Sequence, residues 1–496
     1  MAQTVSRRQA LKLGLTVAGG AAAASTLGAT ASAAESTPTA AASGAALAAR
    51  AAALPWGEAR AIVGRTRLPQ FAFRQFNVLD FGAVPDGTTD NTDAIAAAIG
   101  ACNAAGGGRV VVPAGTYLTG AVHLKSDVNL HLDAGATLAF SGDVTKYPTV
   151  LTRYEGIECM NHSPMVYAYG QRNIALTGSG TLDAGGTSVW NKGSERAYLE
   201  SLIAQGITDP AQRIVPGSGH LMRSTFIEPY RCENVLIQGV TLKNPLFWQL
   251  HPTLCRNVVI DAVTTDPSTA HSNTDGCDPE CCDHVVILDC NLGAHDDNIA
   301  IKSGRDADGR RVNVPSQNIV VFGCTMNGNW GAITCGSEMT GGIRNVYAFD
   351  CTVVGQTKFA LYVKSNTLRG GFARNINLFG FSGTFARSFA FVTMTYNGQT
   401  GNFPPAFGPF TVTRSSCTSA PLVFDVNGLP DDHINGLVVR DCTFDGVTNP
   451  VNSIGNVDSL SFTNVTINGQ PVTGWRRASS RDTPATAVRQ VVVAAV

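Results

Sequence analysis

A short sequence motif recurs along the second half of this chain, and its spacing limits the folds that the chain can adopt. Each copy is a polar residue followed by aliphatic residues and then a turn. The copies begin at Asn234, Asn257, His284, Asn318, Asn345 and Asn375. Successive starts lie 23, 27, 34, 27 and 30 residues apart, and no helix-period stretch of comparable length interrupts them. Short β-rich repeats of this length with glycine turns predict a solenoid, namely a parallel β-helix.

The position six residues after each start favours a packed interior over disulfide bonds. It holds Val240, Val263, Cys290, Cys324, Cys351 and Phe381. Thiol and apolar side chains alternate there because a free cysteine packs as a small hydrophobe. The chain has 13 cysteines, so at least one stays unpaired, and these positions lack the paired CxxC spacing of a zinc site. We therefore predict a column of buried free thiols, and we assign no role to Cys281 and Cys282.

Composition excludes some classes of partner. The formal net charge is −1, which gives no electrostatic reason to bind nucleic acid or an anionic membrane. Charged residues make up 15% and glycine contributes 52 residues, a balance that favours many strands and tight turns over helices or disorder. We expect a monomer that acts without nucleic acid and, in its mature form, without a membrane.

The N-terminal residues have the pattern of a targeting signal. Arg7 and Arg8 precede a mildly apolar stretch, and residues 31–33 read Ala-Ser-Ala, an A-x-A cleavage signal. Residues 1–33 resemble a twin-arginine signal peptide, which predicts a secreted or periplasmic protein. A membrane anchor is the weaker alternative because the stretch is short and only modestly apolar.

The rest of the chain divides into three predicted parts. Residues 34–70 form a flexible Ala-rich segment and a short helix at 57–68, and residues 71–475 form the β-helix. A helix over Thr92 to Cys102 caps its start, and residues 187–222 break the period as an inserted loop with a short helix. Residues 476–496 form a polar tail whose apolar end is able to pair on a strand edge.

Three aspartates within 23 residues are the candidate catalytic groups. Asp275 follows Asn273-Thr274, and Asp296-Asp297 precede an alternating apolar run. Glycosidic bond cleavage needs two carboxyl groups, one to donate a proton and one to act as base or nucleophile. The structural alternative for any such group is a surface salt-bridge or turn-capping cluster.

The repeat sets a register for these aspartates. We align Ile299 with Ile333, Leu361, Cys277 and Leu250 as inward-facing positions, because strand side chains alternate between faces. This alignment places Asp275 above Asp297 one coil apart, at roughly 4.8 Å between strands. Asp296 then lies diagonally from Asp275, which allows the roughly 6.5–9.5 Å of an inverting pair. One of the two adjacent aspartates must sit in a bend, and at least one carboxyl must have a raised pKa.

The same register defines an outer column, which contains His251, Asp278, Ala300, Thr334 and Tyr362. The next outer position holds Glu280, Lys302 and Lys364. His251 and Lys302 are candidate substrate ligands. A hydrogen bond from His251 to Asp278 and a salt bridge from Lys302 to Glu280 are the structural alternatives.

Taken together, the motifs resemble the polygalacturonase family of glycoside hydrolases, family 28. They are Asn273-Thr274-Asp275, Asp296-Asp297 with Ile299-Ala300-Ile301-Lys302, Gly336-Ser337-Glu338, and Lys364 with Arg369-Gly370-Gly371. The likeness runs from about Phe76 to Ile467. It implies an all-β, single-stranded, right-handed parallel β-helix of the pectin-lyase-like type with a short N-terminal helical cap.

The resemblance also implies an activity and residue roles. It implies inverting hydrolysis of α-glycosidic bonds in a pectic polysaccharide, without metal or cofactor. Asp296 would be the general acid, and Asp275 and Asp297 would share the general-base role. Lys364 would bind a substrate carboxylate, with Asn273 and Arg369 as further substrate-binding residues.

Two departures from the family pattern affect the substrate. The family's Gly-His-Gly aligns with Asn329-Trp330-Gly331, and its Arg-Ile-Lys aligns with Tyr362-Val363-Lys364. Loss of a bidentate carboxylate donor weakens the case for galacturonate at that position, whereas Trp330 and Tyr362 offer faces for stacking on a sugar. Outer-face packing is the structural alternative for both rings. A rhamnogalacturonan or modified pectin therefore stays open as the substrate, beside two rival functions, a pectate-lyase-like enzyme and an inactive carbohydrate-binding protein.

Overall fold

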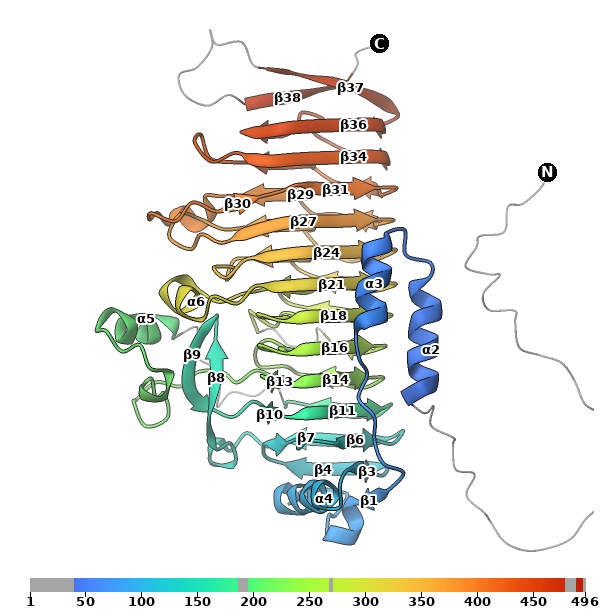
Figure 1. The fold of residues 1–496 in the computed structure, drawn as a ribbon, viewed down its shortest axis with the longest axis vertical. Coiled ribbons are helices and arrows are strands. Elements are labelled where there is room, and N and C mark those ends of the chain that lie inside the picture. Colours follow the sequence, from blue (N-terminus) through green and yellow to red (C-terminus); the bar gives the residue numbers. More distant parts are fainter. Residues whose placement is uncertain (1–39, 186–194, 267–270, 478–487, 494–496) are drawn as a thin grey trace, which may run out of the picture. The chain divides into compact units, whose positions relative to one another are not determined.

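The computed structural model describes residues 40–185, 195–266, 271–477 and 488–493. The predicted signal peptide at 1–33 and residues 34–39 lie outside the described residues. The described chain forms a right-handed parallel β-helix, in which short strands stack as rungs along one long axis (Figure 1). The predicted fold class is therefore confirmed. Three parallel sheets form its faces, and we name them sheets I, II and III.

Sheet II is the longest. Its strands are β1 (Gln75–Asn77), β3 (Gly108–Val112), β6 (Val128–Leu132), β11 (Arg172–Gly178), β14 (Glu233–Gln238), β16 (Arg256–Asp261), β18 (Asp283–Leu288), β21 (Ser316–Phe322), β24 (Ile343–Phe349), β27 (Phe372–Phe379), β31 (Phe410–Thr413), β34 (Ile434–Phe444) and β36 (Val457–Ile467). Sheet III follows it in each coil. Its strands are β2 (Asp86–Asp90), β4 (Gly115–Thr119), β7 (Ala136–Phe140), β12 (Thr181–Asp183), β15 (Thr241–Lys243), β17 (Thr264–Thr265), β19 (Asn291–Ala294), β22 (Thr325–Gly328), β25 (Thr352–Val353), β28 (Ser382–Thr384) and β32 (Ser416–Ser419).

Sheet I carries the candidate site. Its strands are β5 (Val122–His123), β10 (Val166–Tyr169), β13 (Ile227–Tyr230), β20 (Ile299–Ile301), β23 (Gly331–Gly336), β26 (Phe359–Lys364), β29 (Ser388–Thr393), β33 (Leu422–Asn427) and β35 (Ser453–Gly455). Leu250 and Cys277 continue this face between β13 and β20 as single bridges.

The remaining elements decorate the coils. The hairpin β8 (Thr149–Tyr154) and β9 (Ile157–His162) is antiparallel, β30 (Ala406–Phe407) pairs with β27, and β37 (Gln470–Arg477) pairs with β38 (Val488–Val493). The α-helices are α2 (Ala40–Ala51), α3 (Gly57–Arg65), α4 (Thr92–Ala104), α5 (Arg196–Ala204) and α6 (Asp306–Val312), and the short 3-10 helices are η1 (Val78–Phe81), η2 (Val144–Lys146), η4 (Pro210–Gln212) and η5 (Tyr396–Gly398). No described helix is both long and apolar enough to cross a membrane.

The interior column of thiols and apolar residues forms as predicted. Cys290, Cys324 and Cys351 are buried at the same position of successive coils, and Val240 and Phe381 extend the column. All 13 cysteines are buried and free. The thiols therefore act as packing groups inside the solenoid rather than as cross-links.

The polar residue that opens each repeat lies near the start of a strand of sheet II, and these residues stack as a ladder from coil to coil. Its φ is 58° at Asn234, 56° at Asn257, 61° at His284 and 57° at Asn345, the left-handed region that asparagine tolerates better than most residues. Each asparagine amide donates to the side chain one coil earlier, as Asn345 does to Asn318 over 3.0 Å. The repeat is thus a backbone requirement and a hydrogen-bond ladder at once.

Both ends of the described coil stack are covered. Helix α4 buries Ile95, Ile99 and Cys102 against the first coils, as the predicted cap helix does (Figure 1). At the other end β38 pairs antiparallel with β35 and β37, so part of the predicted 476–496 tail forms a strand on this edge. The coil stack therefore exposes few unpaired strand edges.

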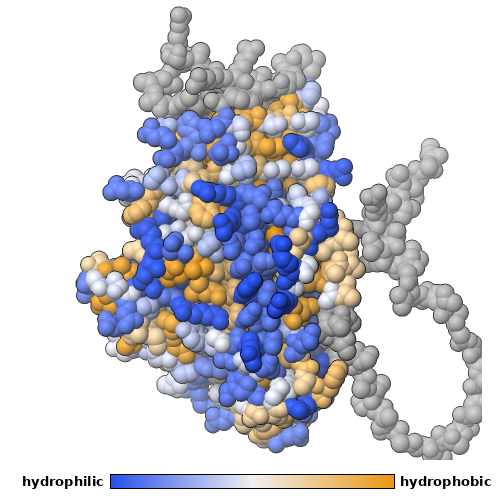
Figure 2. Space-filling model, viewed as in Figure 1, coloured by the Kyte–Doolittle hydropathy of each residue, from blue (hydrophilic) through white to orange (hydrophobic). Residues whose placement is uncertain are grey.

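Residues 40–51 correct one prediction. They form helix α2 rather than a flexible segment, because alanine has the highest helix propensity and Leu47 and Ala51 are buried. Helices α2 and α3 lie against sheet II and cover apolar side chains such as Val286 and Val320 (Figure 1). Elsewhere on the face shown, hydrophilic residues cover most of the coil stack, with hydrophobic residues in smaller patches (Figure 2).

Replacement of one ladder residue tests how much the turn conformation contributes. Asn345 donates one ladder hydrogen bond and accepts another from Asn375. We expect Asn345→Ala to lower the free energy of unfolding by about 1–3 kcal/mol, because the left-handed backbone is unfavourable for alanine and both hydrogen bonds are lost. Asn345→Gly removes only the bonds and should unfold at a higher temperature than Asn345→Ala. Equal midpoints for the two variants by circular dichroism would contradict this account.

Candidate active site

The predicted register of sheet I is confirmed. Ile299 pairs with Ile333, and Ile333 pairs with Leu361. Cys277 bridges Leu250 on one side and Ile299 on the other. Asp275 and Asp297 each lie two residues before one of these bridged positions, so they occupy equivalent places on adjacent coils.

Three carboxyl groups meet there, and we call Asp275, Asp296 and Asp297 the acid cluster. One oxygen from each lies within 4.8 Å of the other two. Asp275 and Asp297 are buried, whereas Asp296 is half-buried. The backbone bends at His295 and Asp296, as the sequence required. This bend brings Asp296 beside Asp275, and the nearest oxygens of the two carboxyl groups lie within 4.8 Å, closer than the diagonal separation that the register predicted.

Asp297 is fixed by three donors. Its Oδ1 accepts from the Gly331 backbone N–H over 2.7 Å and from Thr334 Oγ1 over 2.9 Å, and its Oδ2 lies 2.9 Å from Lys364 Nζ. A side chain at position 331 would place its Cβ 2.0 Å from Thr334 Oγ1. Glycine in Asn329-Trp330-Gly331 is therefore needed for the close approach of this strand to Asp297.

Burial and mutual repulsion divide the protons of the acid cluster. Burial and the charges of Asp275 and Asp297 raise the pKa of Asp296 well above its ordinary value. Burial also raises the pKa of Asp275, while the Lys302 ammonium 3.4 Å away opposes the rise. Asp296 thus has the environment of a carboxyl group that keeps its proton, and its side chain is partly exposed. Both properties suit a proton donor.

Lys302 and His251 differ from their predicted surroundings. Lys302 Nζ lies 3.4 Å from Asp275, 3.4 Å from Asp278 and 3.3 Å from Glu338, above the Trp248 ring. No ion pair between Lys302 and Glu280 forms within the described structure. His251 is fully buried and bonds Glu280 Oε2 over 2.9 Å rather than Asp278.

The hairpin β8–β9 explains this difference. Arg153 on β8 donates to Glu280 over 2.9 Å, and Thr152 donates to Glu228 over 2.5 Å. The hairpin therefore covers the outer face of sheet I, and the outer column that was expected to face solvent is buried at His251 and Asp278. His251 lies too deep to contact a sugar, which corrects its assignment as a substrate ligand.

The two aromatic replacements lie together but differ in exposure. The rings of Trp330 and Tyr362 stack with centroids 6.4 Å apart at 13°. Tyr362 is 2% exposed and packs against Phe359 and Phe391. Its ring therefore supports the Trp330 ring from the buried side. Trp330 is half-buried, and Lys358 Nζ lies 3.2 Å from its ring centroid. Of the two, Trp330 alone offers part of its face to a ligand.

Asn273 and Arg369 flank the acid cluster in different ways. Asn273 adopts φ 58°, is half-buried and accepts from Arg223 over 3.3 Å. Arg369 is 1% exposed and donates to Ser337 over 2.6 Å, so its guanidinium lies behind the surface. Asn273, Lys364 and Arg369 stay predicted substrate ligands, and of these Arg369 is the most deeply buried.

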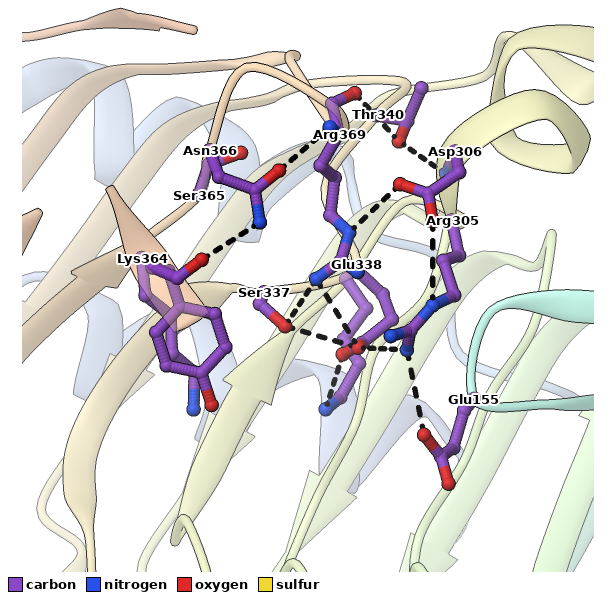
Figure 3. Close-up of polar contacts among 12 residues, drawn as sticks. Glu155, Arg305, Asp306, Ser337, Glu338, Thr340, Lys364, Ser365, Asn366 and Arg369 are labelled. Carbon is purple, nitrogen blue, oxygen red and sulfur yellow. Dashed lines mark hydrogen bonds and ion pairs between the residues drawn. The ribbon is translucent and has the colours of Figure 1, made fainter. Parts of the chain in front are cut away.

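A buried ion network supports the site from behind. Glu338 receives Arg305 at 2.8 Å, Lys302 at 3.3 Å and Arg369 at 3.7 Å. Figure 3 shows the two guanidinium groups converging on the Glu338 carboxylate, with Glu155 of the hairpin turn beyond Arg305. Burial opposes the charge of Glu338, but the three cations outweigh it and hold its pKa well below the ordinary value.

Several residues of the site were not found from the sequence. Arg223, Trp248 and Arg305 lie outside the repeat and the quoted motifs, and Asp278 was placed on an exposed column. Only Asp278 carried a usable signal, because it follows Asp275 by three residues within the same motif.

Comparison with known proteins agrees with this geometry. Residues 211–381 match the family model for glycosyl hydrolases family 28. Residues 75–191 match a model described as rhamnogalacturonase A/epimerase, pectate lyase-like. The crystal structure of a hyperthermoactive exopolygalacturonase from Thermotoga maritima is 34% identical, with a TM-score of 0.78 over 85% of this chain and 96% of that chain.

Two sequence relatives extend the comparison. An exo-poly-alpha-D-galacturonosidase of Dickeya chrysanthemi is 28% identical over 79% of this chain and 70% of its own length. A probable polygalacturonase of Vitis vinifera is 27% identical over 74% of this chain and 73% of its own length. Fold, acid cluster and relatives define a glycosidase. The chain belongs to family 28 of the glycosyl hydrolases.

The Glu338 network predicts a pH-dependent stability. We expect Glu338→Gln to lower the free energy of unfolding at neutral pH by about 3–5 kcal/mol, because it leaves buried cations uncompensated. The folded pKa of Glu338 lies below the unfolded 4.5, so its contribution is present above pH 4.5 and is lost as pH falls through the folded pKa. The difference between variant and wild type should therefore shrink in acid.

Glu200→Gln is the matched control, because Glu200 touches Arg305 at 3.4 Å but is 43% exposed. It should cost about 1 kcal/mol or less. Chemical denaturation across pH measures both variants, and a Glu338→Gln deficit that is constant with pH would contradict the assignment.

Proposed function

We propose that this glycosidase hydrolyses α-glycosidic bonds of a pectic chain from one end, with galacturonate at the cleavage site. Asp296 donates its proton to the leaving oxygen while water attacks the anomeric carbon. Asp275 and Asp297 take the proton of that water, so the bond breaks in one displacement with inversion. The observation that carries the proposal is the cluster of Asp275, Asp296 and Asp297, in which burial and the two neighbouring charges raise the pKa of the half-buried Asp296 well above its ordinary value.

Two lysines support an anionic substrate and argue against a lyase. Lys364 lies on Asp297 at 2.9 Å and Lys302 lies on Asp275 at 3.4 Å. These ammonium groups already balance part of the negative charge that a calcium ion would otherwise neutralise, and calcium takes oxygen ligands. In this proposal Lys364 also shares its charge with a substrate carboxylate beside Asp297.

The covered face of sheet I supports attack at a chain end. On the N-terminal side of the acid cluster, Glu228, His251 and Asp278 are fully buried beneath hairpin β8–β9. On the other side, Trp330, Lys358 and Phe391 are only half-buried. A long chain is therefore stopped at the acid cluster on one side and has room on the other. The named activities of the Thermotoga and Dickeya relatives, both exo-acting, agree with this arrangement.

A modified pectin is the second candidate substrate, and one observation favours it. Tyr362 stands where the family pattern has arginine, and its ring is buried among Phe359 and Phe391. The neighbouring position therefore lacks a bidentate carboxylate donor and presents Trp330 with Lys358 instead. A neutral or esterified sugar next to the cleaved galacturonate would suit this surface.

Export through the twin-arginine pathway completes the proposal. That route carries proteins already folded, and folding before export would enclose all 13 thiols of this chain in a reducing compartment. Arg7 and Arg8 are the residues that would direct it.

Product analysis on defined pectic chains tests the function. We expect release of a single short product from polygalacturonate, with little loss of viscosity while reducing ends accumulate. Asp296→Asn should lower the rate by about 10²–10⁴-fold while binding of substrate survives. An early mixture of long oligomers would overturn the exo assignment. Unsaturated products that absorb ultraviolet light, or no reducing ends from any pectic polymer, would overturn the hydrolase.

A further inference from the structure

Asp278 is a buried carboxyl group that the catalytic roles above do not use. It is fully buried three residues after Asp275. Within the part of the chain that the structure describes, neither of its oxygens has a hydrogen-bond partner, and Asp275 Oδ1 lacks one too. An ionised carboxylate held in this way would lose its hydration and gain no hydrogen bond in return, which is costly even with the Lys302 ammonium 3.4 Å away.

Charge counting around Lys302 points to a retained proton. Lys302 Nζ lies 3.4 Å from Asp275 Oδ2 and 3.4 Å from Asp278 Oδ1. Its third partner, Glu338, has two arginines of its own. Among the described ion pairs, Lys302 is therefore the single cation that Asp275 and Asp278 share. Two carboxyl groups that share one ammonium at this distance do not both ionise readily, so one proton stays between them.

The other charged groups near Asp278 do not change this count. His251 precedes it in the outer column and bonds Glu280, and Glu280 also pairs with Arg153. These contacts direct His251 and Arg153 to Glu280 rather than to Asp278. Ala300 follows Asp278 in the same column and carries no charge. Asp275 and Lys302 are thus the groups that set the protonation of Asp278.

The environment selects Asp278 as the group that holds the proton. Burial and the adjacent Asp275 charge raise the pKa of Asp278 well above its ordinary value. A proton that Asp278 donates to Asp275 would stabilise the charged form of Asp275 and the neutral form of Asp278. A single shared proton then gives a partner to Asp275 Oδ1 and to Asp278 Oδ2, while Asp278 Oδ1 faces Lys302 Nζ at 3.4 Å.

We propose that Asp278 is a positioning residue, which keeps its proton and donates it in a hydrogen bond to Asp275, so that Asp275 stays ionised and oriented toward the attacking water. This inference rests on the proposed general-base role of Asp275. In the reaction, the water oxygen bonds the anomeric carbon and the bond to the leaving oxygen breaks. Asp296 supplies the proton to that oxygen, and Asp275 with Asp297 accepts the proton of the water. The Asp278 proton stays in place throughout.

Two substitutions separate this role from a purely structural one. Asp278→Asn keeps a neutral hydrogen-bond donor of the same shape, so it should retain kcat within about tenfold, and the acidic limb of its pH profile should not move. Asp278→Leu removes the donor, so kcat should fall by about 10²–10³-fold. Its acidic limb should move to higher pH, because the ionised form of Asp275 loses a stabilising bond.

Infrared difference spectroscopy observes the proton directly and needs no substrate. Wild-type protein at neutral pH should show the carbonyl band of a protonated carboxyl group that is missing in Asp278→Asn. An unchanged band in that variant would overturn the proposal. So would a shift of the Asp278→Asn acidic limb to lower pH, the result of removing a charged neighbour of Asp275.

The readouts also keep this inference apart from the proposed function. If wild-type protein cleaves no pectic chain, the hydrolase assignment fails while the infrared band still reports the proton on Asp278. If Asp278→Leu does not fold, the isosteric Asp278→Asn and the wild-type band still decide the question.

Discussion

Two lysine ammonium groups hold this active site together. Lys364 lies on Asp297, and Lys302 lies between Asp275, Asp278 and Glu338. Without them, carboxyl groups stacked on adjacent coils would repel one another at a spacing that the fold itself imposes. With them, the charge is compensated in part, and the remaining imbalance decides which carboxyl groups keep a proton. The proposed division between acid and base therefore follows from the small number of cations beside the acid cluster.

That spacing depends on the register of the solenoid. A slip of one residue in sheet I would turn Asp275 and Asp297 to different faces. The asparagine ladder and the buried thiol column work against such a slip. The ladder aligns successive coils in sheet II, and the thiol column aligns them in the interior. Stability of the coils and geometry of the acid cluster are thus one property, and the hairpin β8–β9 contacts the buried Glu228 and Glu280 on the same face of sheet I.

The features that repeat once per coil could be predicted from the sequence. The ladder beginning at Asn234, the thiol column and the alignment of Ile299 with Ile333 all follow from side chains that recur at fixed positions, and the acid cluster follows from that alignment. The sequence was insufficient for contacts from outside the period. Nothing in Arg153 or Glu155 signals that their hairpin covers sheet I, so His251 was expected to face solvent. The helix at 40–51 was missed because its alanine-rich composition also suits a flexible linker, and only packing on sheet II decides between them.

The stereochemistry of the first product tests the central claim most directly. If Asp296 protonates the leaving oxygen while Asp275 and Asp297 activate water, an α-linked pectic chain gives a reducing end in the β configuration. Proton NMR recorded during early turnover, before mutarotation, should show the β anomer first and the α anomer later. Appearance of the α anomer first would mean retention through a covalent intermediate, and it would contradict the assignment of the acid cluster.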